Sequence, residues 1–138
     1  MSNRLVIVGA PSSAGAYAPG QEKAPAALRA AGLREFLAAR GITVDDRGDV
    51  SGFRWRADRA NPRAMNANAA ATVAAATAER VASALAGDAT VLVLGGDCTV
   101  ELGTVAGALR GTQSVGSTLR TFAEALADAL AASRHRPQ

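Results

Sequence analysis

One stretch of the chain constrains the fold more than any other: residues 91–99, which read Val-Leu-Val-Leu-Gly-Gly-Asp-Cys-Thr. Four consecutive apolar residues predict a strand that is buried on both faces, as strands of parallel sheets are. The glycine pair that follows predicts a tight turn at the carboxyl end of this strand. Ligands of open α/β sheets bind at the carboxyl ends of the strands. The first candidate site residues are therefore Gly95, Gly96, Asp97 and Cys98.

The remaining sequence alternates strand and helix patterns. We expect strands at residues 4–8, 42–45 and 90–94, and helices at residues 26–40, 66–86 and 99–109. Either Asn66 or Asn68 would cap the second of these helices. Strands that alternate with helices pair in parallel through right-handed crossovers, so the pattern predicts an α/β fold.

Composition limits both the core and the partners. Of the 138 residues 49% are hydrophobic, but only 4% are aromatic, so we expect a thin core built from small side chains. The formal net charge is +3, and the basic residues are spread along the chain with no stripe of bases between aromatic residues. We therefore expect no nucleic-acid partner.

Targeting and redox signals are also missing from the sequence. No apolar run approaches the ~20 residues that a membrane span needs, and the first residues lack the pattern of a signal peptide. Cys98 is the only cysteine, which excludes a disulfide within the chain. We therefore expect a cytoplasmic protein with no membrane partner.

The loop at residues 10–23 is longer than most connections between a strand and a helix, which favours a functional role. It could cradle a phosphate. However, residues 9–15 match neither of the glycine-rich phosphate-binding patterns, and Pro11 removes one backbone donor. The alternative is an ordered surface loop.

The turn at residues 95–98 also has two interpretations. In the first, the glycines permit a tight turn and Asp97 caps the next helix. In the second, Cys98 presents a thiolate to a metal or a substrate. A cysteine nucleophile needs a base. The only histidine, His135, lies near the end of the chain, so we do not expect a Cys–His pair.

Three acids, Asp45, Asp46 and Asp49, lie close together in the sequence. Such clusters can bind hard cations. Adjacent residues of a strand point to opposite faces, however, and Arg47 lies among these acids. The sequence therefore favours a solvated turn that begins at about residue 45.

The end of the chain forms a separate unit in this interpretation. Residues 111–116 predict a flexible break, and beyond it Leu119, Phe122, Leu126 and Leu130 recur at helical spacing. We therefore divide the chain into an α/β region at residues 1–110, and a linker with an amphipathic helix at residues 111–138.

Motifs across about residues 4–110 resemble, in order and spacing, the amino-terminal portion of the arginase/agmatinase (ureohydrolase) family. They are residues 6–11, 24–33, 46–50, 61–63 and 91–99. The resemblance implies a three-layer α/β/α fold around a small, mainly parallel sheet. It also implies a pair of manganese ions that activate a hydroxide, and hydrolysis of a C–N bond in a small guanidino substrate.

Two departures from the family pattern affect the metal site. Cys98 occupies the position of the family's histidine ligand, and a thiolate is a softer ligand than manganese prefers. The later Asp-x-His-x-Asp and Asp-x-Asp motifs do not occur in this sequence. We therefore expect a truncated arginase-family chain that is inactive alone.

Two alternatives remain open. The first is a non-catalytic remnant that forms homo-oligomers through the strand at residues 91–94, because that strand would become an exposed sheet edge. The second is a doubly wound nucleotide-binding domain, which the order of strands and helices would suit.

Overall fold

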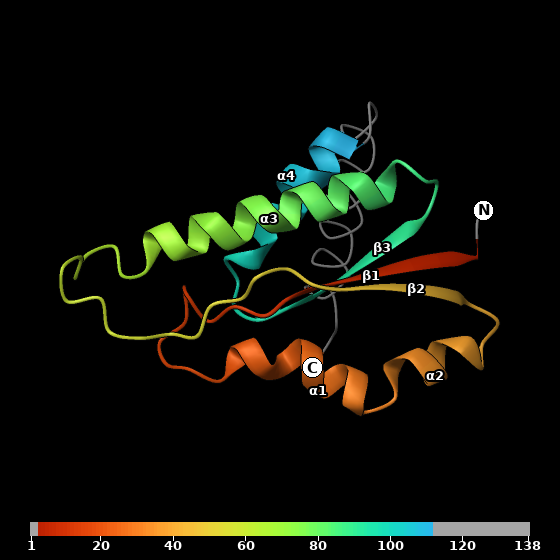
Figure 1. Cartoon of the computed structure of the whole chain (residues 1–138), viewed down its shortest axis with the longest axis horizontal. Coiled ribbons are helices and arrows are strands. Elements are labelled where there is room, and N and C mark those ends of the chain that lie inside the picture. The colour runs from red at the N-terminus through yellow and green to blue at the C-terminus, as the bar shows by residue number, and fades with distance from the viewer. Residues whose placement is uncertain (1–2, 112–138) are drawn as a thin grey trace, which may run out of the picture.

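The computed structural model describes residues 3–111, which form a parallel sheet of three strands (Figure 1). The strands are β1 (Arg4–Ala10), β2 (Thr43–Asp49) and β3 (Thr90–Gly95), in the order β2-β1-β3. Because β1 is central, the side chains of Val6, Ile7 and Val8 are almost fully buried. Their β-branched shapes suit a strand that is covered on both faces.

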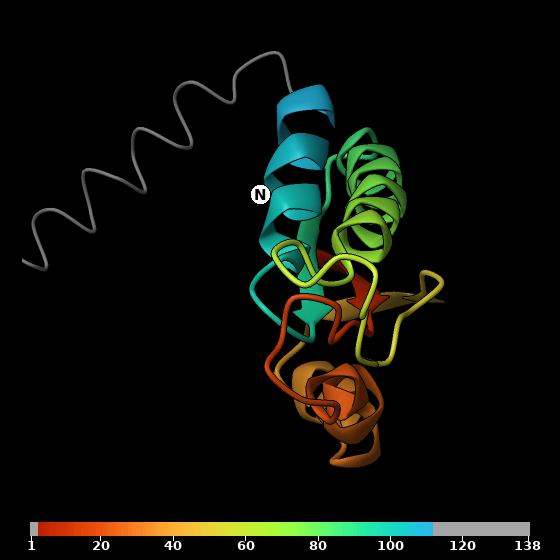
Figure 2. The ribbon, with the colours of Figure 1, turned by 90° about the vertical axis from the view of Figure 1, so that its left-hand side faces the viewer.

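Helices cover both faces of the sheet, which confirms the predicted three-layer α/β/α arrangement (Figures 1 and 2). One layer holds the 3-10 helix η1 (Gln21–Lys23) with the helices α1 (Ala24–Ala30) and α2 (Leu33–Ala38). The other layer holds α3 (Ala67–Leu85) and α4 (Val100–Gly111). No helix within residues 3–111 is both long enough and apolar enough to cross a bilayer.

The core between the sheet and α3 consists of small apolar side chains, as the composition predicts. One buried cluster contains Ala10, Val50, Val73 and Val100, and a second contains Val6, Val8 and Ala84. Glycines also let α4 lie close against α3. A Cβ at Gly103 or Gly107 would collide with a backbone carbonyl of α3.

The prediction of a single helix at residues 26–40 is wrong, because the structure has two short helices there. Gly32 separates them and has a φ of +87°, in the left-handed region that favours glycine. A glycine at this position ends α1, just as Gly41, with a φ of +74°, follows α2.

The turn expected from residue 45 is also wrong, because β2 continues to Asp49. A bulge at Gly48, where φ is +71°, shifts the register against β1. Asp46 and Asp49 are then both paired with Arg29 of α1. Arg29 Nε lies 2.7 Å from Asp46 Oδ2, and Arg29 Nη1 lies 2.6 Å from Asp49 Oδ1. These ion pairs explain why acids can occupy β2, which is an edge strand among residues 3–111.

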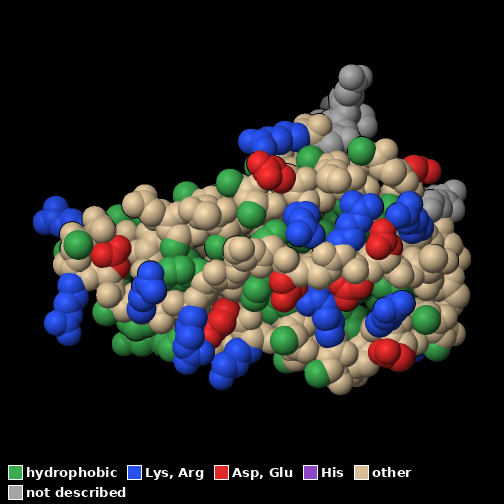
Figure 3. Space-filling model, viewed as in Figure 1, with side chains coloured by type: hydrophobic (Ala, Val, Ile, Leu, Met, Phe, Trp, Pro, Cys, Tyr) green, Lys and Arg blue, Asp and Glu red, His purple; other side chains and the backbone are tan. Residues whose placement is uncertain are grey.

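Charges of both signs alternate over the rest of this side of the molecule. Asp45 pairs with Arg4 at 2.8 Å, and Arg54 pairs with Glu22 at 2.6 Å. On the face in Figure 3, basic side chains accordingly lie among acidic ones rather than in a single patch.

The other element boundaries lie close to the predictions. Asn66 holds the position before α3, as one prediction had it, but its φ is +56° and its side chain does not cap the helix. α4 ends at Gly111, the first residue of the predicted break. The rest of that break and the predicted helix from Leu119 lie outside the described residues.

Candidate functional site

The candidate site lies at the carboxyl ends of β1 and β3, where three loops meet. The first follows β1 at residues 11–16, the second follows β2 at residues 50–55, and the third joins β3 to α4 at residues 96–99. This is the edge at which the sequence places Gly95, Gly96, Asp97 and Cys98.

Asp97 fastens the turn after β3 to the loop after β1. Its side chain is buried, and both carboxylate oxygens accept hydrogen bonds from the backbone. Oδ1 accepts from the Thr99 N–H at 2.8 Å and from the Thr99 hydroxyl at 2.5 Å. Oδ2 accepts from the Gly15 N–H at 3.0 Å. Asp97 therefore fixes the turn that leads into α4, and both of its carboxylate oxygens are already hydrogen-bonded within the chain.

The glycines of this turn are needed for close approach rather than for an unusual φ. A Cβ at Gly96 would collide with the Ser12 carbonyl, because Ser12 O accepts a hydrogen bond from the Asp97 N–H at 2.9 Å. A Cβ at Gly95 would lie 3.3 Å from Val100 Cγ1, a tight contact with a side chain rather than with backbone. Gly15 is similarly confined by Thr99.

The backbone N–H groups of the loop after β1 donate hydrogen bonds within the chain. The Ser13 N–H donates to the Phe53 carbonyl at 2.8 Å, and the Ala14 N–H donates to the Ser12 hydroxyl at 3.1 Å. The N–H groups of Gly15 and Ala16 are bonded as well, to Asp97 and Ser13. A phosphate would need such N–H groups to be free. The geometry therefore favours the ordered-loop interpretation of this segment.

Ser13 and Glu22 add a buried link that the sequence analysis did not single out. The Ser13 hydroxyl accepts from the Trp55 N–H at 2.7 Å. The pKa of Glu22 is lowered to about 2, chiefly by a hydrogen bond with the Ser13 side chain, and further by the Gly20 N–H and by Arg54. No sequence motif connects these residues, because Ser13 and Glu22 lie in the connection between β1 and α1, whereas Trp55 and Arg54 follow β2.

Cys98 is exposed and lines a groove of about 460 Å³ along β3 and α4. The groove also contains Glu101, Thr104 and the half-buried Val91 and Val93. β3 is an edge strand among residues 3–111, so one long side of this groove is open.

The described residues do not fit a pair of manganese ions. Within residues 3–111, no three His, Cys, Asp or Glu side chains lie close enough together to hold a metal ion. The Asp97 carboxylate already accepts hydrogen bonds from Gly15 and Thr99. The remaining candidate ligand in this turn is Cys98, whose thiolate is softer than manganese prefers.

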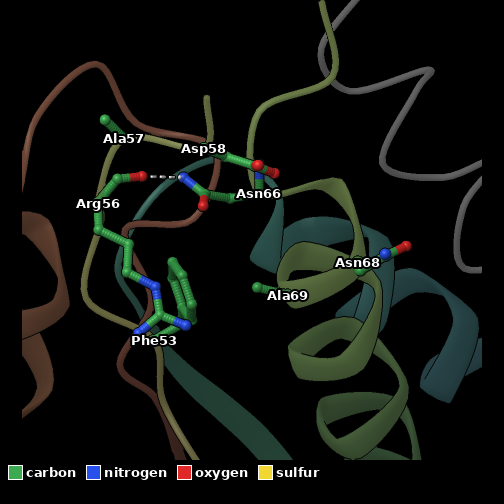
Figure 4. A pocket seen from close by; sticks show the side chains of 7 residues that line it. All are labelled: Phe53, Arg56, Ala57, Asp58, Asn66, Asn68 and Ala69. Atoms are coloured by element: carbon green, nitrogen blue, oxygen red, sulfur yellow. Dashed lines mark hydrogen bonds between the residues drawn. The ribbon is translucent and has the colours of Figure 1, made fainter. Parts of the chain in front are cut away.

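A second, smaller cavity of about 330 Å³ lies at the start of α3 (Figure 4). The Arg56 guanidinium lies over the Phe53 ring, 5.1 Å from its centroid. Asn66 Nδ2 donates to the Arg56 carbonyl at 3.0 Å, and the Asn66 N–H donates to Asp58 at 3.3 Å. These contacts hold the loop that precedes α3 in place.

Comparison with known proteins identifies the family. The family model described as "Arginase family" matches residues 3–118, which is most of the chain. The chain belongs to the arginase family. Its resemblance to that family, read from the sequence motifs, is therefore confirmed.

Curated arginases match over most of this chain but only part of their own length. Rat mitochondrial arginase-2 (Rattus norvegicus) is 34% identical over 107 residues, which cover 77% of this chain and 30% of the relative. The arginase of Bacillus subtilis is 29% identical over 116 residues, which cover 84% of this chain and 39% of the relative. The chain thus spans about a third of the length of these arginases.

A solved arginase shows the same fold. The crystal structure of the Bacillus subtilis arginase superposes with a TM-score of 0.65 at 30% identity, and the match covers 76% of this chain and 33% of that one. The three-stranded parallel sheet with helices on both faces is therefore an arginase-like α/β fold.

Proposed function

We propose that this chain supplies the amino-terminal third of a manganese-dependent, arginase-type hydrolase of guanidino C–N bonds, and that it is inactive alone. The family match over residues 3–118 carries this proposal. In the chain itself, the Gly-Gly-Asp-Cys turn lies at the carboxyl end of β3, where a site of this fold is expected.

The role of the described residues in this proposal is structural. Asp97 and Gly96 hold the turn against the loop after β1, and this places Cys98 on the open groove beside β3. The remaining metal ligands would come from outside residues 3–111. The substrate would be a small guanidino compound, by analogy with the family.

Fragment complementation tests the proposal. The full chain is co-expressed with Bacillus subtilis arginase lacking the segment that this chain matches, and urea release from arginine and agmatine is measured with Mn²⁺. We expect activity only when both pieces are present. The Cys98→His variant should give several-fold more activity, because imidazole suits manganese better than a thiolate does.

The control is the Bacillus segment itself, supplied in place of this chain. If that segment restores urea release while neither this chain nor its Cys98→His variant does so, the proposed function is wrong.

A second candidate function is self-association through β3. The observation that favours it is the position of β3 at the edge of the sheet among the described residues, with Val91 and Val93 half-buried in an open groove. Light scattering during size-exclusion chromatography tests it. A dimer that Val93→Lys converts to a monomer would support this candidate, and a wild-type monomer at all concentrations would exclude it.

A further inference from the structure

The outer face of α4 carries an apolar stripe. Leu102, Val105 and Leu109 are 67%, 42% and 53% exposed. Their spacing of three and four residues places them on one side of the helix. A contiguous row of exposed leucine and valine side chains usually marks a surface that packs against another segment or another protein.

This stripe points away from the rest of the described fold. Gly103 and Gly107 form the side of α4 that packs on α3, and the stripe lies on the opposite side. Figure 2 shows α3 along one side of α4 and no other helix or strand of residues 3–111 along the other.

The sequence that follows α4 carries a matching pattern. Leu119, Phe122, Leu126 and Leu130 recur at spacings of three and four. A helix from Leu119 to Leu130 would equal the twelve residues of α4 in length, about 18 Å. Residues 112–118, which include Gly116, are long enough to reverse the chain between two antiparallel helices.

We propose that residues 119–130 pack as an antiparallel helix on the stripe formed by Leu102, Val105 and Leu109. The connection makes this contact intramolecular, so it has an effective concentration in the millimolar range, and a second copy of the chain competes poorly for the same face. The proposal goes beyond the proposed function and does not rest on it.

Cysteine pairs in the full chain test the contact. Cys98→Ser first removes the only native thiol. Val105→Cys is then combined with Ala123→Cys, on the apolar face of the predicted helix, or with Thr121→Cys, on its opposite face. All three positions keep the leucines and Phe122 in place. After mild oxidation of dilute protein, intact mass and non-reducing electrophoresis measure the disulfide.

We expect an intrachain disulfide in most molecules of the Val105/Ala123 pair, at a yield at least fivefold above that of the Val105/Thr121 pair. Equal yields from the two pairs, no disulfide, or mainly interchain dimers would each overturn the proposal.

An independent readout uses substitutions on the helix faces. Phe122→Asp with Leu126→Asp should raise the fluorescence of an apolar dye severalfold by uncovering the stripe. Ala125→Asp with Ala132→Asp adds the same charge away from the apolar face and should leave the fluorescence near that of the wild type. Equal increases from both double variants would also contradict the contact.

Discussion

At the scale of single residues, the site depends on two backbone segments that touch. Gly96 lies against the Ser12 carbonyl and Gly15 lies beside Asp97 and Thr99, so loops more than eighty residues apart in the sequence form one unit. The sequence showed Gly96 as a turn residue, but it could not show Ser12, because that contact exists only after β1 and β3 have paired.

Gly96→Ala tests this close approach. The added Cβ has to displace backbone at Ser12, so we expect a loss of about 1–3 kcal/mol in the free energy of unfolding. Urea denaturation measures it. Gly95→Ala is the matched control, since its Cβ would lie 3.3 Å from a side-chain methyl of Val100 rather than against backbone, and its cost should be clearly smaller. Equal costs would argue against the Gly96–Ser12 contact.

The lowered pKa of Glu22 predicts that the folded chain becomes less stable in acid. Its pKa is lowered from 4.5 to about 2 in the folded chain, so its stabilising contribution is present above pH 4.5 and is lost as the pH falls toward 2. Urea midpoints between pH 5 and pH 2 should therefore fall less steeply in Glu22→Gln than in the wild type. Glu35→Gln, at an exposed position of α2, should retain the wild-type slope.

At the scale of elements, Arg29 joins α1 to β2. It donates to Asp46 through Nε and Nη2 and to Asp49 through Nη1, and it lowers the pKa of Asp46. Because of this pairing, the acidic segment that the sequence predicts as a solvated turn continues as strand β2 to Asp49. The sequence could not predict it, because Arg29 lies seventeen residues away from Asp46 on another element.

Arg29→Met should therefore leave two neighbouring carboxylates without their partner. We expect about 1–2 kcal/mol of destabilisation in denaturant titrations at low salt, and less at 1 M NaCl because salt screens the repulsion. Arg59→Gln removes the same charge from an exposed loop and should change stability little. A loss that does not respond to salt would show that Arg29 acts through packing instead.

Strands and long helices were largely predictable, and their ends were less so. The apolar runs at β1 and β3 lie where their patterns place them, since a buried parallel strand needs such a run. The sequence does not predict the break between α1 and α2, because apolar residues recur at helical spacing on both sides of Gly32. The left-handed φ of Gly32 is seen only in the folded chain. Among residues 3–111, β3 is an edge strand, as one alternative expected from the missing later motifs, and Cys98 lines the groove beside it.

At the scale of the whole molecule, the chain has the fold of an arginase over about a third of an arginase's length. Its described residues hold the turn at the end of β3 in place, and they bring no group of three metal-binding side chains together. We therefore infer a separation between the turn that this chain holds in place and a complete metal centre, which would need further residues.

Native mass spectrometry of the full chain, with and without Mn²⁺, tests that separation most directly. We expect the mass of the chain to be unchanged by micromolar Mn²⁺, and we expect no urea release from arginine or agmatine. Two manganese ions held by a single chain, removed by a chelator and accompanied by urea release, would contradict it.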